Sequence, residues 1–217
     1  MPVRRLLLIA LVLAAATGCG GEKSSTPDDP GRATLAAFLH AAEEGDTDLM
    51  RGLLSLQSNR RLSVSELSRL AARLRPIARR YSLLVSERIT DGFGVAAVSG
   101  PAGVYAAALR REGEDWRLEV GGPVTITPLG PDPGARDAVV QQIAAEIEGG
   151  RGSGDALFYL DGTVVPFTKT YTAATAFTAL ANLPSPVRRG RHSIVTFAHR
   201  GGSATALAWT FSVLGKG

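Results

Sequence analysis

Cysteine is nearly absent from this chain. Cys19 is the only cysteine among 217 residues, so no internal disulfide can form and the folded parts must be held by their hydrophobic cores. The same scarcity removes every C-x-x-C pair, and neither H-E-x-x-H nor G-x-S-x-G occurs. The sequence therefore predicts no metal site, no cofactor and no enzyme activity.

Lysine and long apolar runs are also scarce. Lys occurs only at positions 23, 169 and 216. The formal net charge is +4, and loss of Arg4 and Arg5 with an N-terminal leader would leave about +2. This excess is too small to predict nucleic-acid binding. The charge-free apolar run at residues 6–16 is shorter than the roughly 20 residues that a membrane-spanning helix needs.

The N-terminus has the order of a secretory leader. Arg4 and Arg5 precede the apolar run, and Ala16, Thr17 and Gly18 then lead to Cys19. This segment resembles a bacterial lipobox, so residues 1–18 are expected to be a lipoprotein signal peptide. The resemblance implies acyl chains on Cys19 that anchor the mature chain on the extracytoplasmic side of a bacterial membrane. Each buried CH₂ of such a chain contributes about 0.8 kcal/mol.

A spacer is expected after the lipidated cysteine. Residues 19–33 are rich in Gly, Ser, Pro and Asp, a composition that cannot bury apolar surface. We therefore predict a flexible tether over this range.

Residues 34–122 are expected to form the first folded unit. Apolar residues at helical spacing predict a helix over 34–45, and Asp46 can cap a second one. The sequence from Ser63 to Glu66 is a capping-box pattern that opens a third helix with apolar residues on one face. Period-two patterns then predict strands over 81–89, 95–98, 104–109 and 116–120.

The expected unit has three helices followed by an antiparallel sheet, and the charged turn Glu112-Gly-Glu-Asp115 precedes Trp116. This arrangement resembles the NTF2-like (cystatin-like cone) lipoprotein domains. The resemblance implies an α+β fold in which the helices pack on a curved sheet. It also implies a possible pocket, for which Tyr81, Tyr105 and His40 are the candidate polar groups. The alternative interpretation places Tyr105 and His40 at the surface.

The third predicted helix carries an excess of arginine. Arg69, Arg73 and Arg80 fall close to one face, and a basic face beside anionic lipid contributes roughly 1 kcal/mol per arginine that reaches it. We predict these three residues as contacts to an anionic surface, with an ordinary solvated helix face as the alternative.

Residues 123–217 are expected to form a second unit. Gly and Pro cluster over residues 121–136. Short strand patterns with turns follow, and Asp161-Gly162 is the strongest short hairpin signal among them. Residues 139–147 fit a helix or a strand. Tyr159-Leu-Asp-Gly162 and Ala208-Trp-Thr-Phe-Ser-Val213 resemble bacterial Ig-like domains, which implies an all-β sandwich. His192 and His199, seven apart, should point to opposite faces of one strand.

These patterns predict a lipid-anchored cell-envelope protein that acts as a non-catalytic binding or interaction module. Its expected partners are the membrane, through lipid on Cys19, and an anionic lipid or an envelope protein. The alternative is a small-ligand carrier or cryptic enzyme that uses a pocket in the cone. A cone filled by Leu35, Phe38, Leu70 and Leu109 would favour the first hypothesis.

Overall fold

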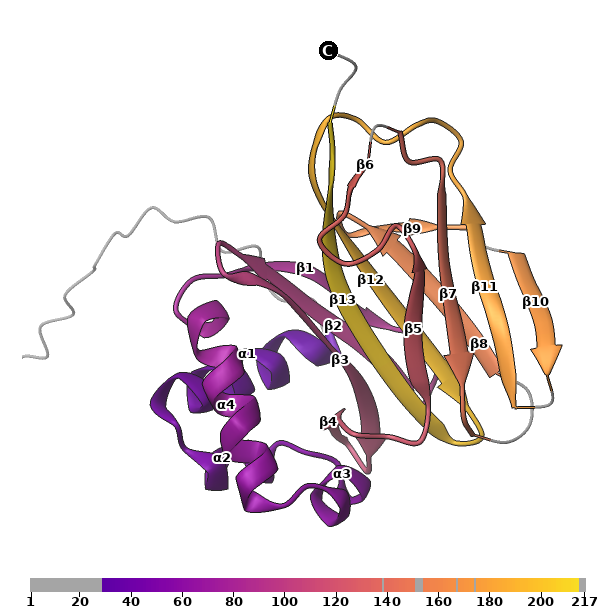
Figure 1. The fold of residues 1–217 in the computed structure, drawn as a ribbon. Helices are drawn as coiled ribbons and strands as arrows, with labels where there is room; N and C mark the ends of the chain where they lie inside the picture. Colours follow the sequence, from indigo (N-terminus) through magenta and orange to yellow (C-terminus); the bar gives the residue numbers. More distant parts are fainter. Residues whose placement is uncertain (1–28, 138, 151–153, 167, 174, 215–217) are drawn as a thin grey trace, which may run out of the picture.

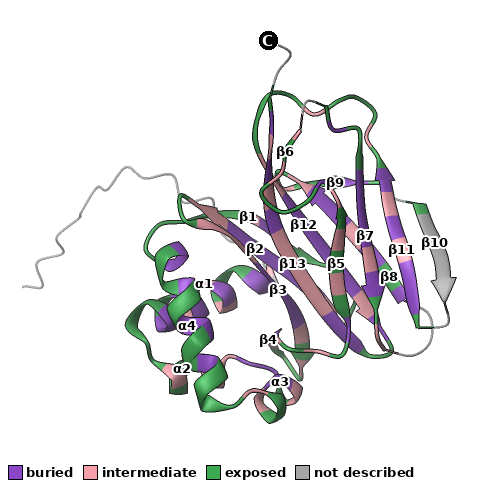
Figure 2. Cartoon of the chain, viewed as in Figure 1, coloured by how far each residue is buried: buried purple, intermediate pink, exposed green. Residues whose placement is uncertain are grey.

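The computed structural model describes residues 29–137, 139–150, 154–166, 168–173 and 175–214. Within them, one layer of helices and three sheets stack in the order helices, sheet A, sheet C and sheet B (Figure 1). Three hydrophobic clusters fill the spaces between these layers, so most buried residues lie on strands in the middle of the molecule (Figure 2).

Four helices form the outer layer. They are α1 (Pro30–Glu44), α2 (Thr47–Gly52), α3 (Leu56–Arg61) and α4 (Val64–Ala78). Asp46 caps α2, and the capping box predicted at Ser63 is present, with Glu66 binding back to the Ser63 backbone. The short helix α3 was not predicted; Ser55 caps it by accepting a hydrogen bond from the Ser58 N–H.

The predicted tether extends too far into the chain. Residues 19–33 were expected to be flexible, but α1 already begins at Pro30. Asp29 caps this helix by accepting from the Arg32 N–H, and Pro30 suits the first helical position because its missing N–H has no helical partner there. Residues 30–33 therefore belong to the folded body. Within the described residues, no helix is long and apolar enough to cross a membrane.

Sheet A is an antiparallel meander of four strands. It consists of β1 (Ser82–Arg88), β2 (Phe93–Gly100), β3 (Gly103–Glu112) and β4 (Asp115–Glu119), paired in chain order. All four lie where the period-two patterns predicted strands. The last hairpin is tighter than expected, because Glu112 pairs with Asp115 and leaves a two-residue turn.

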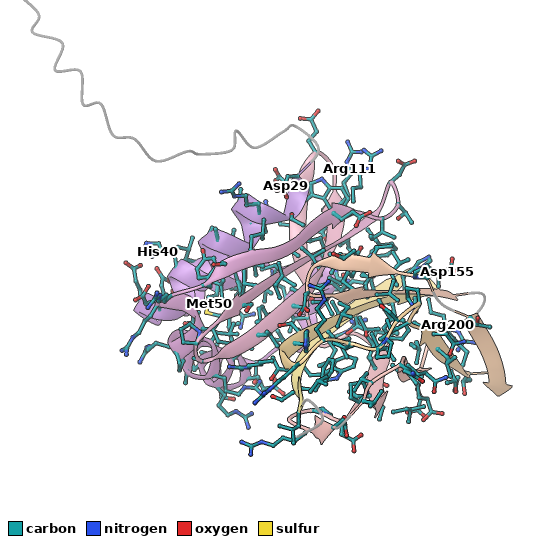
Figure 3. All side chains as sticks on the ribbon, turned by 90° about the horizontal axis from the view of Figure 1, so that it is seen from above. Asp29, His40, Met50, Arg111, Asp155 and Arg200 are labelled. Atoms are coloured by element: carbon teal, nitrogen blue, oxygen red, sulfur yellow. The ribbon has the colours of Figure 1, made fainter. Side chains whose placement is uncertain are left out.

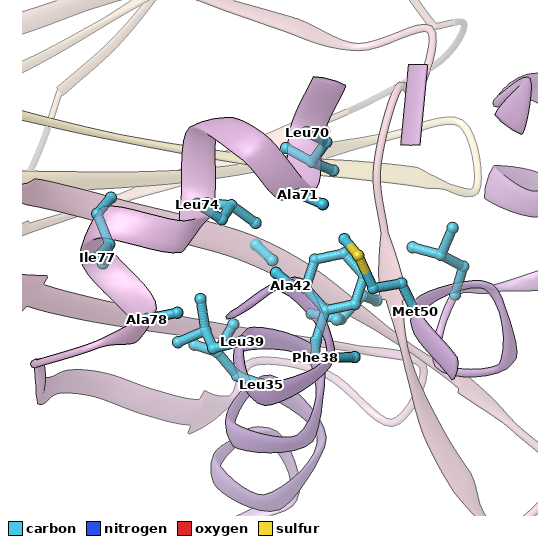
Figure 4. Packing of buried hydrophobic residues seen from close by; sticks show 14 of the residues in the cluster. Leu35, Phe38, Leu39, Ala42, Met50, Leu70, Ala71, Leu74, Ile77 and Ala78 are labelled. Carbon is cyan, nitrogen blue, oxygen red and sulfur yellow. The ribbon is translucent and has the colours of Figure 1, made fainter. Parts of the chain in front are cut away.

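The predicted α+β fold of the NTF2-like type is wrong. The described chain is 49% strand and 24% helix, and its helices do not pack on a curved sheet as in such a cone. Both faces of sheet A are buried, one against the helices and the other against sheet C. Leu35, Phe38, Leu70 and Leu109 belong to one buried cluster and fill the space beneath the helices (Figure 4).

Sheets B and C form the predicted β-sandwich. Sheet B contains, in spatial order, β10 (Thr168–Ala173), β11 (Ala176–Asn182), β7 (Gln142–Glu148) and β5 (Thr125–Gly130). Sheet C contains β6 (Arg136–Asp137), β13 (Ser203–Val213), β12 (Gly190–Arg200), β8 (Gly154–Leu160) and β9 (Thr163–Val165). The ambiguous residues 139–147 are resolved as strand, since β7 covers most of them. The sequence patterns missed β6 and β10.

Sheet C is buried on both faces, because successive side chains along its strands point alternately into two hydrophobic cores. On β13, Trp209 and Phe211 point into the core shared with sheet B, whereas Ala204, Ala206 and Ala208 point toward sheet A. Sheet A meets them with small residues of its own, including Ala106 and Ala108 on β3. Small side chains let two sheets approach closely, which explains the alanine-rich strands on both sides of the contact. The two predicted units are therefore joined through a continuous apolar interface.

Candidate functional site

An open, largely apolar hollow lies at one end of the sandwich. We call it the sandwich-end groove. It has a volume of about 430 Å³ and is lined by Leu160, Asp161, Thr163, Val164, Val165, Pro166, Leu183, Pro184, Ser185, Pro186, Val187, Arg188 and His192. The β8–β9 hairpin forms one wall and the loop between β11 and β12 forms the other.

Both walls are fixed by local chemistry. Asp161 and Gly162 have positive φ angles of 50° and 83°, as a tight two-residue hairpin turn requires. A Cβ on Gly162 would come within 2.6 Å of the Leu84 carbonyl oxygen in β1, so the turn sits directly against sheet A. The opposite loop is held at its ends, where the Leu183 and Val187 N–H groups donate to the carbonyls of Gln141 and Val140.

A contact between His192 and Asp161 lies in the lining of the groove. His192 Nδ1 is 2.7 Å from Asp161 Oδ2, and His192 Nε2 is 2.7 Å from the Arg188 carbonyl oxygen. The other Asp161 oxygen accepts from the Ser193 N–H at 2.8 Å. The His192 ring also stacks at a tilt against Phe211, with centroids 5.4 Å apart.

These contacts give the Asp161–His192 pair a structural role. A general base needs a free nitrogen or oxygen aimed at a substrate proton. Both ring nitrogens of His192 and both carboxylate oxygens of Asp161 are already engaged within the protein. The pair instead fastens the β8–β9 turn and the 183–188 loop to the first residues of β12.

The predicted arginine face borders a different hollow. Arg69 and Arg73 line a groove of about 620 Å³ beside α4, together with Leu62, Glu66, Leu70, Ala72, Val120 and Gly121. We call it the α4 groove. Arg80 follows the end of α4 and is exposed but does not line this hollow. The structure therefore brings two of the three predicted arginines together over an apolar floor.

The two predicted pocket tyrosines are separated. Tyr81 lines a third hollow, of about 370 Å³, with Arg32, Leu35 and Leu83 among its neighbours. Tyr105 instead packs against the core beneath the helices, where burial raises the pKa of its hydroxyl and nearby Arg73 partly opposes the shift. Its ionisation is therefore suppressed, which argues against a role as a base.

The remaining candidate residues have simpler surroundings. His40 is exposed on α1 and lies 3.5 Å from Glu44, at the outer edge of the helical layer (Figure 3). His192 and His199 do point to opposite faces, since His199 contacts Phe93 and Phe197 on the side of sheet A. Among the described residues no cluster of metal-ligating side chains is present. Cys19 lies outside the described residues.

Sequence patterns missed the sandwich-end groove. Asp161-Gly162 was recognised as a turn and His192 as a strand residue, but their contact depends on the pairing of β8 with β12. That pairing brings Leu160 opposite Ile194 across more than thirty residues of chain. The loop prolines Pro184 and Pro186 are the signal that could have indicated a preformed wall, since proline fixes φ and offers no N–H.

No protein-family model and no curated protein sequence matches the chain. Among solved structures, the methionine-rich copper resistance protein PcoC from Escherichia coli aligns over 41% of this chain and 94% of its own, with 13% identity and a TM-score of 0.32. An endo-β-1,4-mannanase from Thermotoga petrophila aligns over 45% of this chain and 21% of its own, with 12% identity and a TM-score of 0.35. The N-terminal eight Ig domains of Down syndrome cell adhesion molecule align over 61% and 20%, with 11% identity and a TM-score of 0.31. Likenesses this low assign the chain to no family.

Proposed function

We propose that this protein is a lipid-anchored cell-envelope protein that acts as a non-catalytic binding module, with the sandwich-end groove as its binding site. The observation that carries the proposal is the groove itself, an apolar hollow with one wall hydrogen-bonded to the segment before β7 and the other packed against sheet A. Its volume of about 430 Å³ falls within the range of ligand sites. Its only histidine is committed to contacts within the protein.

The anchor is the second part of the proposal. It rests on the lipobox-like segment before Cys19, and it places the folded body at the membrane surface through the segment up to α1. An Ig-like relationship of the sandwich, suggested by phrases such as Tyr159-Leu-Asp-Gly162, fits the same role, because such sandwiches commonly present loops at one end for binding.

Site-specific photocross-linking in cells that express the full chain tests the binding site. A benzophenone side chain at Val164, which lines the groove and is 48% exposed, should capture a discrete partner. The matched control is the same probe at Val64 on α4, which is 62% exposed and far from the groove in the chain. Adducts at Val164 but not at Val64 support the proposal. Equal adducts at both positions, or none at Val164, contradict it.

Cell fractionation tests the anchor. The native chain should be recovered with membranes, with a mass that includes acyl chains on Cys19. The variant Cys19→Ala should accumulate as unprocessed precursor, because the lipid-accepting thiol is missing. A Cys19→Ala chain that matures and stays with membranes as the native chain does would show that the anchor is wrong.

A further inference from the structure

We propose that the occupant of the sandwich-end groove is an extended acidic segment of a partner protein, which inserts one apolar side chain. The inference rests on the proposed function and names the ligand class of the same site. Three features carry it: the apolar lining, the open edge of β9 and the arginine at the rim.

The hollow shape of the apolar lining suits a single inserted side chain of a partner better than a flat partner surface. Val164, Val165, Pro184, Pro186 and Val187 are among the apolar residues of the walls. Burial of apolar surface favours binding in proportion to the area removed from water. The backbone bonds that pin the 183–188 loop mean that little ordering is needed when a ligand enters.

The open strand edge favours an extended peptide. Among the described strands, β9 is the outermost strand of sheet C and pairs with β8 alone. Across the two-residue turn Leu160 pairs with Thr163, so the next residue, Val164, directs its N–H and C=O away from β8. The Val164 N–H and C=O can therefore form two main-chain hydrogen bonds with one residue of an incoming strand. Pro166 has no N–H, so the pairing ends there and the recognised segment is short.

Positive charge around the groove favours acidic residues on either side of the inserted ligand side chain. Asp161 is the only acidic residue in the lining, and His192 is bound to it. Arg188 lines the rim and is exposed, and Arg189 and Arg191 lie exposed on either side of Gly190. The surroundings of the groove therefore carry an excess of positive charge, which favours carboxylates beside the inserted side chain and disfavours basic ones.

Fluorescence polarisation with labelled peptides tests the inference on the full-length lipidated protein in nanodiscs of neutral lipid. The probe is a peptide of sequence EDLVLDE with the fluorophore on its N-terminus and an amidated C-terminus. The control peptides replace the acidic residues with lysine, replace the apolar centre with serine, or methylate the backbone nitrogen of the central valine. We expect saturable binding of the probe and at least about tenfold weaker binding of the lysine peptide. The serine and N-methyl peptides should also bind more weakly.

Charge reversal at the rim gives a matched pair of variants. Arg188→Glu should weaken binding of the acidic probe by about tenfold and strengthen that of the lysine peptide, whereas Arg189→Glu, outside the lining, should have a smaller effect. Both side chains are exposed, so both variants should fold. Equal binding of acidic and basic peptides, or equal effects of the two variants, would overturn the inference. Cross-linking at Val164 without any peptide binding would overturn it while leaving the proposed binding function intact.

Discussion

The Tyr159 hydroxyl donates a 2.8 Å hydrogen bond to a Glu87 carboxylate oxygen, and this contact joins sheet C to sheet A. Tyr159 is 2% exposed and belongs to the apolar cluster between the two sheets. Its ring therefore supplies buried surface, and its hydroxyl reaches the rim of the same interface. A tyrosine is suited to this position because it combines a large apolar body with a polar end.

Removal of that hydroxyl should weaken the junction of the sheets. In Tyr159→Phe the ring remains but the hydrogen bond is lost, so we expect a loss of about 0.5–1.5 kcal/mol in the free energy of unfolding at pH 7. Urea denaturation followed by circular dichroism measures it. Tyr81→Phe is the control, because Tyr81 is 36% exposed and lies outside this interface. Equal stability of Tyr159→Phe and the native chain would contradict the assigned role.

Tyr159 should also make the free energy of unfolding depend on pH in the alkaline range. Burial, followed by the Glu87 hydrogen bond and charge, raises the pKa of Tyr159. A raised pKa in the folded state means that this contribution is complete below the unfolded value of about 10 and falls above it, by about 1.4 kcal/mol per pH unit. Tyr159→Phe should therefore show a shallower decline between about pH 10 and 11. An unchanged slope would show that Tyr159 ionises equally in both states.

A second contact between sheet A and sheet C includes a buried ion pair. Arg110 donates from Nε to Glu119 at 2.5 Å and from Nη2 to the Gly202 carbonyl oxygen in the β12–β13 turn at 2.5 Å. The Glu119 side chain is fully buried. Arg110→Leu should cost about 3–5 kcal/mol, because it leaves a buried carboxylate without its partner.

Two further variants separate this effect from simple loss of packing. The double variant Arg110→Leu with Glu119→Leu should recover much of the lost stability, since no isolated charge remains. Arg111→Leu, at the neighbouring exposed position, should change the free energy of unfolding little. A double variant as unstable as the single one would place the cost in packing or in the Gly202 contact instead.

Local structure could largely be predicted from the sequence, but the layering could not. The period-two patterns located β1 to β4 and most sandwich strands, because side chains alternate between faces. On β3, however, Ala106 and Ala108 face one layer while Ala107 and Leu109 face another, and all four are apolar. Such a strand must be covered on both sides. Nothing local in the sequence identifies sheet C as the second cover, so the sequence pattern alone predicts that sheet A forms the wall of a cone.

The groove was missed for a related reason. Its walls come from residues 160–166 and 183–192, which meet only through strand pairing within sheet C. The sequence indicated the Asp161-Gly162 turn correctly but gave no sign that Asp161 would bind His192. By contrast, Arg69 and Arg73 were placed on one helix face from spacing alone, because four residues separate them on a regular helix.

The capping box at the start of α4 should be visible in a titration. Hydrogen bonds from the Ser63 side chain and backbone lower the pKa of Glu66, and Arg69 adds to the effect. Ser63→Ala removes the hydroxyl donor, so the Glu66 pKa should rise toward its ordinary range. Glu66 then contributes less pH-dependent stability to the helix start, because its pKa in the folded state lies closer to the unfolded value. Carbon-detected NMR of the Glu66 carboxyl measures the midpoint, and an unchanged midpoint would show that the backbone contact alone is sufficient.

Contact of the arginine face with anionic lipid is the last prediction, and vesicle sedimentation of residues 20–217, produced without the leader and without Cys19, tests it. Arg69 and Arg73 line the α4 groove over Leu62, Leu70 and Val120, so a lipid head group could meet guanidinium groups while its glycerol region meets hydrocarbon. We expect binding to vesicles that contain phosphatidylglycerol, little binding to phosphatidylcholine, and weakening as salt screens the charges. Replacement of Arg69, Arg73 and Arg80 by alanine should remove roughly 1 kcal/mol for each arginine that reaches the surface.

The matched control is Arg75→Ala, because Arg75 turns to the other flank of α4 and donates to the Glu43 carbonyl oxygen. Equal binding to neutral and anionic vesicles, or an equal loss in the control, would assign these arginines to a solvated helix face and leave the lipid on Cys19 as the sole proposed membrane contact.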